Sequence, residues 1–209
     1  MSARDNILTK IGAAQHKGAP TPTDAGDAPQ RRSIPPIEED LIQRFCAQAR
    51  RLASDISVAA SLSEVPGLAA AYLREQELPL SAVCWPSVSD LDWRRAGMMV
   101  IAGAASADDL VGITGAFLGI AETGTLMLLS GRETPATVSL LPETHIAILK
   151  STRIVVTMED AWDRLRSEYG ALPRAVNFIS GPSRTADIEQ TVTLGAHGPY
   201  RVLIVIVKE

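Results

Sequence analysis

Cysteine is scarce in this chain: its 209 residues include only Cys46 and Cys84, which lie far apart in the sequence. Zinc sites and iron–sulfur clusters are usually held by sets of four ligands, most of them closely spaced cysteines or histidines. The two cysteines have no such spacing, so we expect neither centre and no cofactor in this chain. Two buried, reduced thiols are favoured over a disulfide bridge. Reduced thiols are typical of a cytoplasmic protein.

Basic residues, aromatic residues and long apolar runs are also in short supply. Lys and Arg number 20 against 24 Asp and Glu, a net charge of −4, so nothing favours binding to nucleic acid. No apolar run approaches the length of a membrane span, and the first residues lack the apolar stretch of a secretory signal. Aromatic residues make up only 4% of the chain, so Ala, Val, Ile and Leu must build the core. With 46% hydrophobic residues, that core is sufficient for one globular domain with a small appendage.

Composition divides the chain into three parts. Residues 1–17 are expected to hold a short amphipathic helix, with Ile7 and Leu8 on one side, that docks on the domain or on a partner subunit. Residues 18–36 are rich in Pro, Gly, Thr and Asp and are expected to form a linker. The remaining domain is predicted to occupy residues 37–209.

Helix-like and strand-like patterns alternate along this domain. Helices are predicted from about Ile37, from Ser63 to Gln76, and after a capping box of Thr157 and Asp160. The third helix is expected to end at Gly170 and to bury Trp162, Leu165 and Tyr169. Strands are predicted at 56–60, 81–85, 98–102, 126–129, 146–149, 154–156, 176–179 and 202–207. The last is wholly apolar, as in strands covered on both faces, so the pattern indicates an α/β fold with a mostly parallel sheet flanked by helices.

The first candidate site follows the predicted strand 176–179. A Gly-Pro turn there is predicted to open into a helix, whose unpaired N–H groups and dipole would bind an anion such as phosphate or carboxylate. The guanidinium of Arg184 can fork onto the same anion. The segment by itself favours a simpler interpretation, in which Ser183 or Thr185 only caps the helix. The residues assigned to this site are Gly181, Ser183, Arg184, Thr185 and Asp187.

The second candidate site is the glycine-rich segment Gly112–Thr125, in which Glu122 carries the only charge. A carboxylate among small and apolar residues can act as a general base, a nucleophile or a metal ligand. It can equally be a structural acid bonded to backbone N–H groups of the turn at Gly124. Nearby hydroxyl groups slightly favour function, and we assign Thr114, Glu122, Thr123, Gly124 and Thr125 to the site. The run leads into a strand and not a helix, so it does not match a dinucleotide-binding fingerprint.

Three further residues are candidate ligands. His145 and His197 lie in predicted loops beside strands, where they can bind a metal or relay protons, although a structural histidine is favoured at each position. Arg132 follows the predicted strand 126–129 and either reaches an anionic ligand or is simply exposed.

In this order, four segments resemble the lactate-utilisation (LUD) domain family. They are Gly112–Thr125, Ser139–Pro142 with His145, Gly181–Glu189 and Gly195–Pro199. The family looks like a relative of the sugar-phosphate isomerase and coenzyme A transferase fold, so the resemblance implies a three-layer α/β architecture. The chain departs from the family pattern at Phe117, where an aspartate is common. A polar site that relies on that aspartate is therefore expected to be altered or lost.

The resemblance also implies a function. It indicates a component of a cytoplasmic system that oxidises L-lactate to pyruvate, in which iron–sulfur clusters belong to partner proteins and this chain carries an anion-binding cleft. A first alternative is a coenzyme A transferase-like or sugar-phosphate isomerase-like enzyme that uses Glu122 on an anionic small molecule. A second is a binding module that senses a carboxylate without turning it over.

Overall fold

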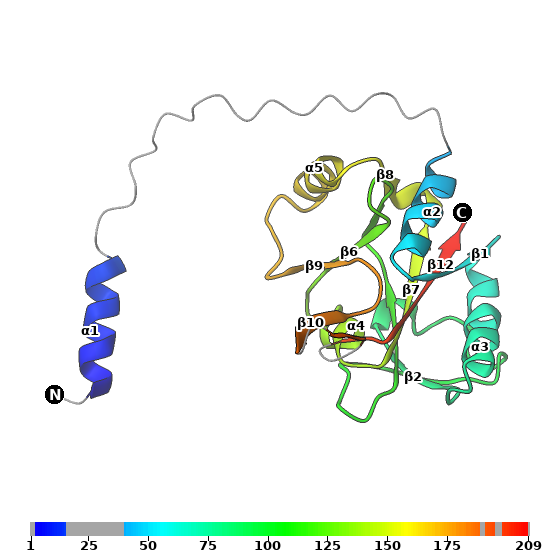
Figure 1. Ribbon diagram of the computed structural model, residues 1–209, viewed down its shortest axis with the longest axis horizontal. Coiled ribbons are helices and arrows are strands. Elements are labelled where there is room, and N and C mark those ends of the chain that lie inside the picture. Colours follow the sequence, from blue (N-terminus) through cyan, green and yellow to red (C-terminus); the bar gives the residue numbers. More distant parts are fainter. Residues whose placement is uncertain (1–2, 16–39, 189–190, 195–197, 209) are drawn as a thin grey trace. The chain divides into compact units, whose positions relative to one another are not determined.

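The computed structural model describes residues 3–15, 40–188, 191–194 and 198–208 (Figure 1). The chain divides into two units, Met1–Pro36 and Ile37–Glu209, and each is described by itself. In the first unit, α1 (Ala3–Gln15) is the helix predicted at the start of the chain, and its Ile7 and Leu8 side chains are exposed. The linker predicted at 18–36 lies outside the described residues.

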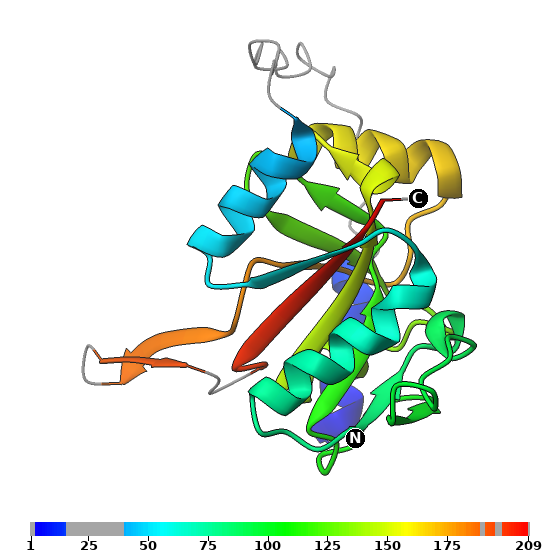
Figure 2. The same ribbon diagram turned by 90° about the vertical axis from the view of Figure 1, so that its right-hand side faces the viewer.

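The second unit is built on a six-stranded sheet in the order β1-β12-β7-β4-β2-β3, in which every neighbouring pair is parallel (Figure 2). Its strands are β1 (Asp55–Ala59), β2 (Ser81–Cys84), β3 (Met99–Ala102), β4 (Val111–Gly115), β7 (Thr144–Lys150) and β12 (Arg201–Val207). Strand β12 lies between β1 and β7, and all its residues after Arg201 are buried. Its unbroken apolar run therefore marks a strand covered on both faces, as predicted.

Helices flank this sheet, which confirms the predicted α/β class. Helix α3 packs on β1 and β12, α4 on β4 and β7, and α2 on β1 (Figure 2). The α-helices of this unit are α2 (Leu41–Arg51), α3 (Val65–Glu75), α4 (Thr137–Leu140) and α5 (Met158–Tyr169). Short 3₁₀ turns form η1 (Leu62–Glu64), η2 (Pro86–Val88) and η3 (Ser151–Arg153).

A second, mixed sheet of four strands adds a layer that the sequence patterns did not predict as a separate sheet. Its order is β8-β5-β6-β9, with β5 (Leu118–Ile120), β6 (Thr125–Leu129), β8 (Ile154–Val155) and β9 (Val176–Ile179). Alternate residues of β6 serve two cores: Leu126 and Leu128 join the main core, whereas Met127 and Leu129 pack with Leu165 of α5. Because side chains alternate across a strand, β6 joins the main core to the layer under α5.

Helix α5 follows the sequence prediction closely. Thr157 accepts a hydrogen bond from the N–H of Asp160, and the Asp160 carboxylate accepts one from the N–H of Thr157, both at 3.1 Å. Leu165 is buried, and the helix ends at Gly170, whose φ of 65° suits glycine. Tyr169 was expected to be buried, but 56% of it is exposed because it lies in the last turn at the surface.

The glycine-rich segment Gly112–Thr125 forms strands of its own, β4 and β5, before it reaches β6. Gly112 lies so close to α4 that an added Cβ atom would be 1.9 Å from the carbonyl oxygen of Val138. Gly112 of β4 therefore allows α4 to approach the sheet closely, which is one of the roles of glycine within a strand.

The helix predicted after Gly181 and Pro182 is wrong. The chain instead forms an antiparallel hairpin of β10 (Arg184–Ile188) and β11 (Thr191–Leu194), drawn in orange in Figure 2. Thr and Ile at positions 185, 188, 191 and 193 favour extended backbone, and pairing between the two strands overrides the local helix signal. The helix N-terminus that was expected to bind an anion is therefore absent from this segment.

Candidate functional site

Two of the predicted segments meet through a chain of hydroxyl groups. Thr123 Oγ1 donates to Thr125 Oγ1 at 2.9 Å, and Thr125 Oγ1 shares a hydrogen bond with Ser180 Oγ, also at 2.9 Å. Thr125 is almost completely buried at the start of β6, and Ser180 follows the last residue of β9. The structure therefore joins the turn at Gly124 to the turn at Gly181, although 57 residues separate them.

Both turns also press against the carboxyl-terminal end of α2. A Cβ atom on Gly124, where φ is +69°, would be 2.2 Å from the backbone nitrogen of Ala49. One on Gly181, where φ is +81°, would be 2.1 Å from the carbonyl oxygen of Leu52. The two glycines are thus required by positive φ and by close approach to the same helix end.

Described residues of the other segments that resemble the LUD family lie close together near the amino ends of β7 and β12. The N–H of Ser183 donates to the carbonyl of Pro199 at 2.9 Å, and the N–H of Tyr200 donates to that of Glu143 at 2.7 Å. A Cβ atom on Gly198 would be 3.1 Å from the Cβ of Ser183. These contacts are made by backbone and small groups, and the Ser183 N–H is already used. The cluster is therefore better suited to holding loops together than to cradling an anion.

Three of the charged residues predicted for the candidate sites, Glu122, Arg132 and Arg184, are at the surface. Glu122 is exposed, and its N–H donates to the carbonyl of Val156 at 3.0 Å. The N–H of Gly124 donates to Ile120 and not to the Glu122 carboxylate, which makes no hydrogen bond or ion pair with any described residue. Arg132 and Arg184 are exposed as well. The environment of Glu122 is therefore aqueous and not the apolar one expected from its neighbours in sequence.

His145 is fully buried at the start of β7. Its Nε2 shares a hydrogen bond of 2.8 Å with the hydroxyl of Thr114 on β4, and its Nδ1 has no partner among the described residues. Burial lowers the pKa of the imidazole to about 4, so the ring is neutral near pH 7. A neutral ring with no exposed surface has the character of a structural histidine.

Two of the remaining predicted residues belong to the hairpin, and the third is not among the described residues. Thr185 and Asp187 are backbone positions of β10, and His197 lies outside the described residues.

Phe117, where the resemblance led us to expect an aspartate, belongs to an aromatic and cationic cluster. Its ring meets Tyr169 edge to face at 5.6 Å, and the Arg153 guanidinium lies 5.5 Å from its centre. Arg153 also pairs with Glu168 at 2.7 Å, and these bonds hold the pKa of that carboxyl below its usual value. Phe117 is therefore held in packing contacts and supplies no carboxylate at this position.

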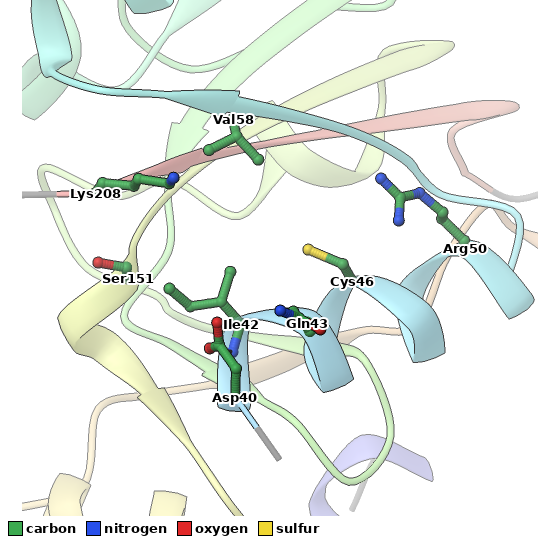
Figure 3. Close-up of a pocket in the computed structure, with 8 residues that line it drawn as sticks. All are labelled: Asp40, Ile42, Gln43, Cys46, Arg50, Val58, Ser151 and Lys208. Carbon is green, nitrogen blue, oxygen red and sulfur yellow. Dashed lines mark hydrogen bonds between the residues drawn. The ribbon is translucent and has the colours of Figure 1, made fainter.

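A pocket that the sequence analysis missed lies between α2 and the carboxyl ends of β12 and β7 (Figure 3). Its volume is about 750 Å³, within the usual range for sites that bind small molecules. Ligands of open parallel sheets bind outside the carboxyl ends of the strands, which is where this pocket lies. Its lining residues are Asp40, Ile42, Gln43, Cys46, Arg50, Val58, Ser151 and Lys208.

Positive charge dominates this α2 pocket. Arg50 comes from the last turn of α2, and Lys208 directly follows β12, where its N–H donates to the carbonyl of Ala59. Among the described lining residues the one carboxylate belongs to Asp40, which accepts the N–H of Ile42 at 2.9 Å and caps α2. The Cys46 thiol lies between them, and burial raises its pKa, so it stays protonated near pH 7. The sequence offered one indication of this pocket, since Lys208 directly follows a predicted strand. Arg50 belongs to no motif that would have pointed to it.

Metal and membrane sites receive no support from the described residues. Among the described residues, no group of three or more His, Cys, Asp or Glu side chains is placed to hold a metal ion. No helix in the described ranges combines the length and apolar character needed to cross a membrane.

The architecture defines a class of α/β proteins with a parallel six-stranded sheet and a smaller mixed sheet. A DUF162 family protein from Deinococcus radiodurans is similar in structure, with a TM-score of 0.62 and 23% sequence identity over 80% of this chain and 96% of that one. The family model of the LUD domain matches residues 90–207, which are more than half of the sequence. The chain belongs to the LUD domain family.

Several relatives carry the name Lactate utilization protein C. The one from Halalkalibacterium halodurans is 40% identical over 116 residues, which are 54% of this chain and 50% of that protein. The one from Bacillus subtilis is 39% identical over 102 residues, 47% of this chain and 42% of that protein. The chain thus matches about half the length of these relatives.

Proposed function

We propose that this chain is a component of a cytoplasmic L-lactate utilisation system, in which it works with iron–sulfur proteins that oxidise L-lactate to pyruvate. The observation that carries the proposal is the identity of about 40% to proteins named Lactate utilization protein C. The chain has few ligands for a cluster, with two cysteines and three histidines in 209 residues, so electron transfer is assigned to the partners.

The contribution of the chain itself is to bind an anionic small molecule. The α2 pocket supports this role, because Arg50 and Lys208 line it from separate elements and Asp40 is the one acidic residue among its described lining residues. Guanidinium and ammonium groups are the usual partners of carboxylates in such sites. The proposed anion site is therefore placed at α2 and not at the Gly181 turn.

The proposal is tested by deleting the gene in its own organism and measuring growth on L-lactate and on pyruvate. We expect growth on L-lactate to fail and growth on pyruvate to continue, with recovery when the full-length gene is returned. Affinity purification of the tagged chain from lactate-grown cells is expected to recover iron–sulfur proteins. Normal growth of the deletion strain on L-lactate would contradict the proposal.

The alternative in which Glu122 acts in catalysis can be separated from a structural role with Glu122→Gln. The side chain is exposed and makes no bond with a described residue, so the variant is expected to keep its melting temperature within about 1 °C. If the returned Glu122→Gln gene supports growth on L-lactate as well as the unaltered gene does, Glu122 has no essential catalytic role.

A further inference from the structure

The two cations of the α2 pocket face each other across it. In Figure 3 the Lys208 ammonium and the Arg50 guanidinium point inward from opposite ends, and the Cys46 thiol lies between them. Each cation is held by a different part of the fold, since Arg50 belongs to α2 and Lys208 is anchored to β1 through Ala59. The packing of α2 on β1 therefore sets the backbone positions from which the two side chains reach into the pocket.

Neither cation is neutralised inside the pocket. Among the described residues, neither Arg50 nor Lys208 forms an ion pair, so the Asp40 carboxylate that lines the same pocket and caps α2 is paired with neither cation. An anion with a single charged group can approach one cation and leaves the other without a counter-charge. A molecule with a carboxylate at each end can engage both at once.

The middle of the pocket suits a short carbon chain. Ile42 and Val58 contribute apolar surface between the two charged ends, and 45% of Val58 is otherwise exposed to solvent. Methylene groups placed against these side chains would remove apolar area from water, which stabilises the complex. Ser151, Gln43 and the Cys46 thiol offer hydrogen bonds along the same path.

We propose that the α2 pocket binds an elongated dicarboxylate, with one carboxylate at Arg50 and the other at Lys208. This inference deepens the proposed anion-binding role and rests on it. Its failure is distinguishable from failure of the proposed function, because the growth experiment requires no knowledge of the ligand.

The experiment is isothermal titration calorimetry, which measures the affinity of the full chain for a series of straight-chain diacids from malonate to adipate. Acetate, L-lactate and inorganic phosphate serve as short or compact comparison anions. Because the two cations extend from separate packed elements, affinity should pass through a maximum at the chain length that spans them. The best diacid should bind at least about tenfold more tightly than acetate or L-lactate, as expected for an added charge-assisted contact.

Substitutions locate the binding. Arg50→Gln and Lys208→Gln should each weaken the best diacid about tenfold or more and remove the dependence on chain length. Arg51→Gln and Lys150→Gln are matched controls, since these exposed residues are adjacent in structure or sequence but do not line the pocket. Both controls should bind as the unaltered chain does. Arg50→Lys and Lys208→Arg keep the charge and should retain part of the affinity, and they replace the Gln variants if those do not fold.

Three results would overturn the inference. The first is equal affinity for all diacids and for acetate, which would leave no two-ended site. The second is unchanged affinity in Arg50→Gln and Lys208→Gln, which would place the acids elsewhere. The third is tighter binding of phosphate than of any diacid, which would indicate a compact anion site.

Discussion

Gly124 occupies a position where no side chain fits. Its φ is +69°, and an added Cβ would lie 2.2 Å from backbone atoms of α2, which cannot move without disturbing the core around Ala49. We expect Gly124→Ala to lower the free energy of unfolding by about 2–4 kcal/mol, from strained backbone and overpacking together. Urea denaturation followed by circular dichroism measures the change.

Gly67 provides the matched control for this substitution. It lies within α3, is exposed, and an added Cβ would meet no atom within 4 Å. Gly67→Ala should raise the free energy of unfolding by about 0.5–1 kcal/mol, because alanine favours helix. Similar stability for the two variants would show that Gly124 is not constrained as described.

His145 should make stability depend on pH. Its pKa is lowered by burial from 6.5 to about 4, so between these values the unfolded chain binds a proton that the folded chain does not. The free energy of unfolding should therefore fall as pH drops from 6.5 to 4, by roughly 3 kcal/mol from this residue alone. Urea denaturation at half-unit steps of pH measures this slope.

Other titrating groups also contribute to that slope, so a variant is needed. His145→Gln has no titrating side chain and keeps an amide that can bond Thr114. It should be less stable at pH 7 but lose less stability on acidification than the unaltered chain. Parallel curves for the two proteins would mean that His145 titrates normally and is not buried as described.

At the scale of elements, one predicted helix cap is confirmed and another is absent. The capping box of Thr157 is present, whereas Ser63, predicted to begin and cap a helix, lies inside η1, and its hydroxyl shares a hydrogen bond with Ser61. Thr157→Ala should cost about 1 kcal/mol of stability, and Ser63→Ala should stay within about 0.5 kcal/mol of the unaltered chain. Thermal unfolding of both variants tests this, and an equal loss for the two would contradict it.

Elements with a strong local pattern could be predicted from the sequence. The apolar run of β12, the strand β9 and helix α5 all lie where their residues indicated. The hairpin of β10 and β11 could not, because its strands stabilise each other through pairing that a local pattern does not contain. The strands β4 and β5 were missed for a related reason. Gly112 and Gly119 lie in them because α4 and α2 pack closely against these positions, and a local pattern does not show such packing.

At the scale of the molecule, contacts between segments far apart in the sequence decide which residues lie together and where charge gathers. The turns at Gly124 and Gly181 lie together through Thr125 and Ser180. The α2 pocket draws its cations from the end of a helix near residue 50 and from the last described residue, 208. Arg50 lies outside the matched LUD segment, so no motif pointed to this combination. Only the parallel pairing of β1 with β12 brings these parts together.

The central claim is that this LUD protein binds a two-ended anion between Arg50 and Lys208. The most direct measurement is a crystal structure of the full chain grown with the diacid that binds most tightly. We predict density for the acid along α2, with one carboxylate against the Arg50 guanidinium and the other against the Lys208 ammonium. An empty α2 pocket at saturating diacid, or density beside Arg184 instead, would contradict the account.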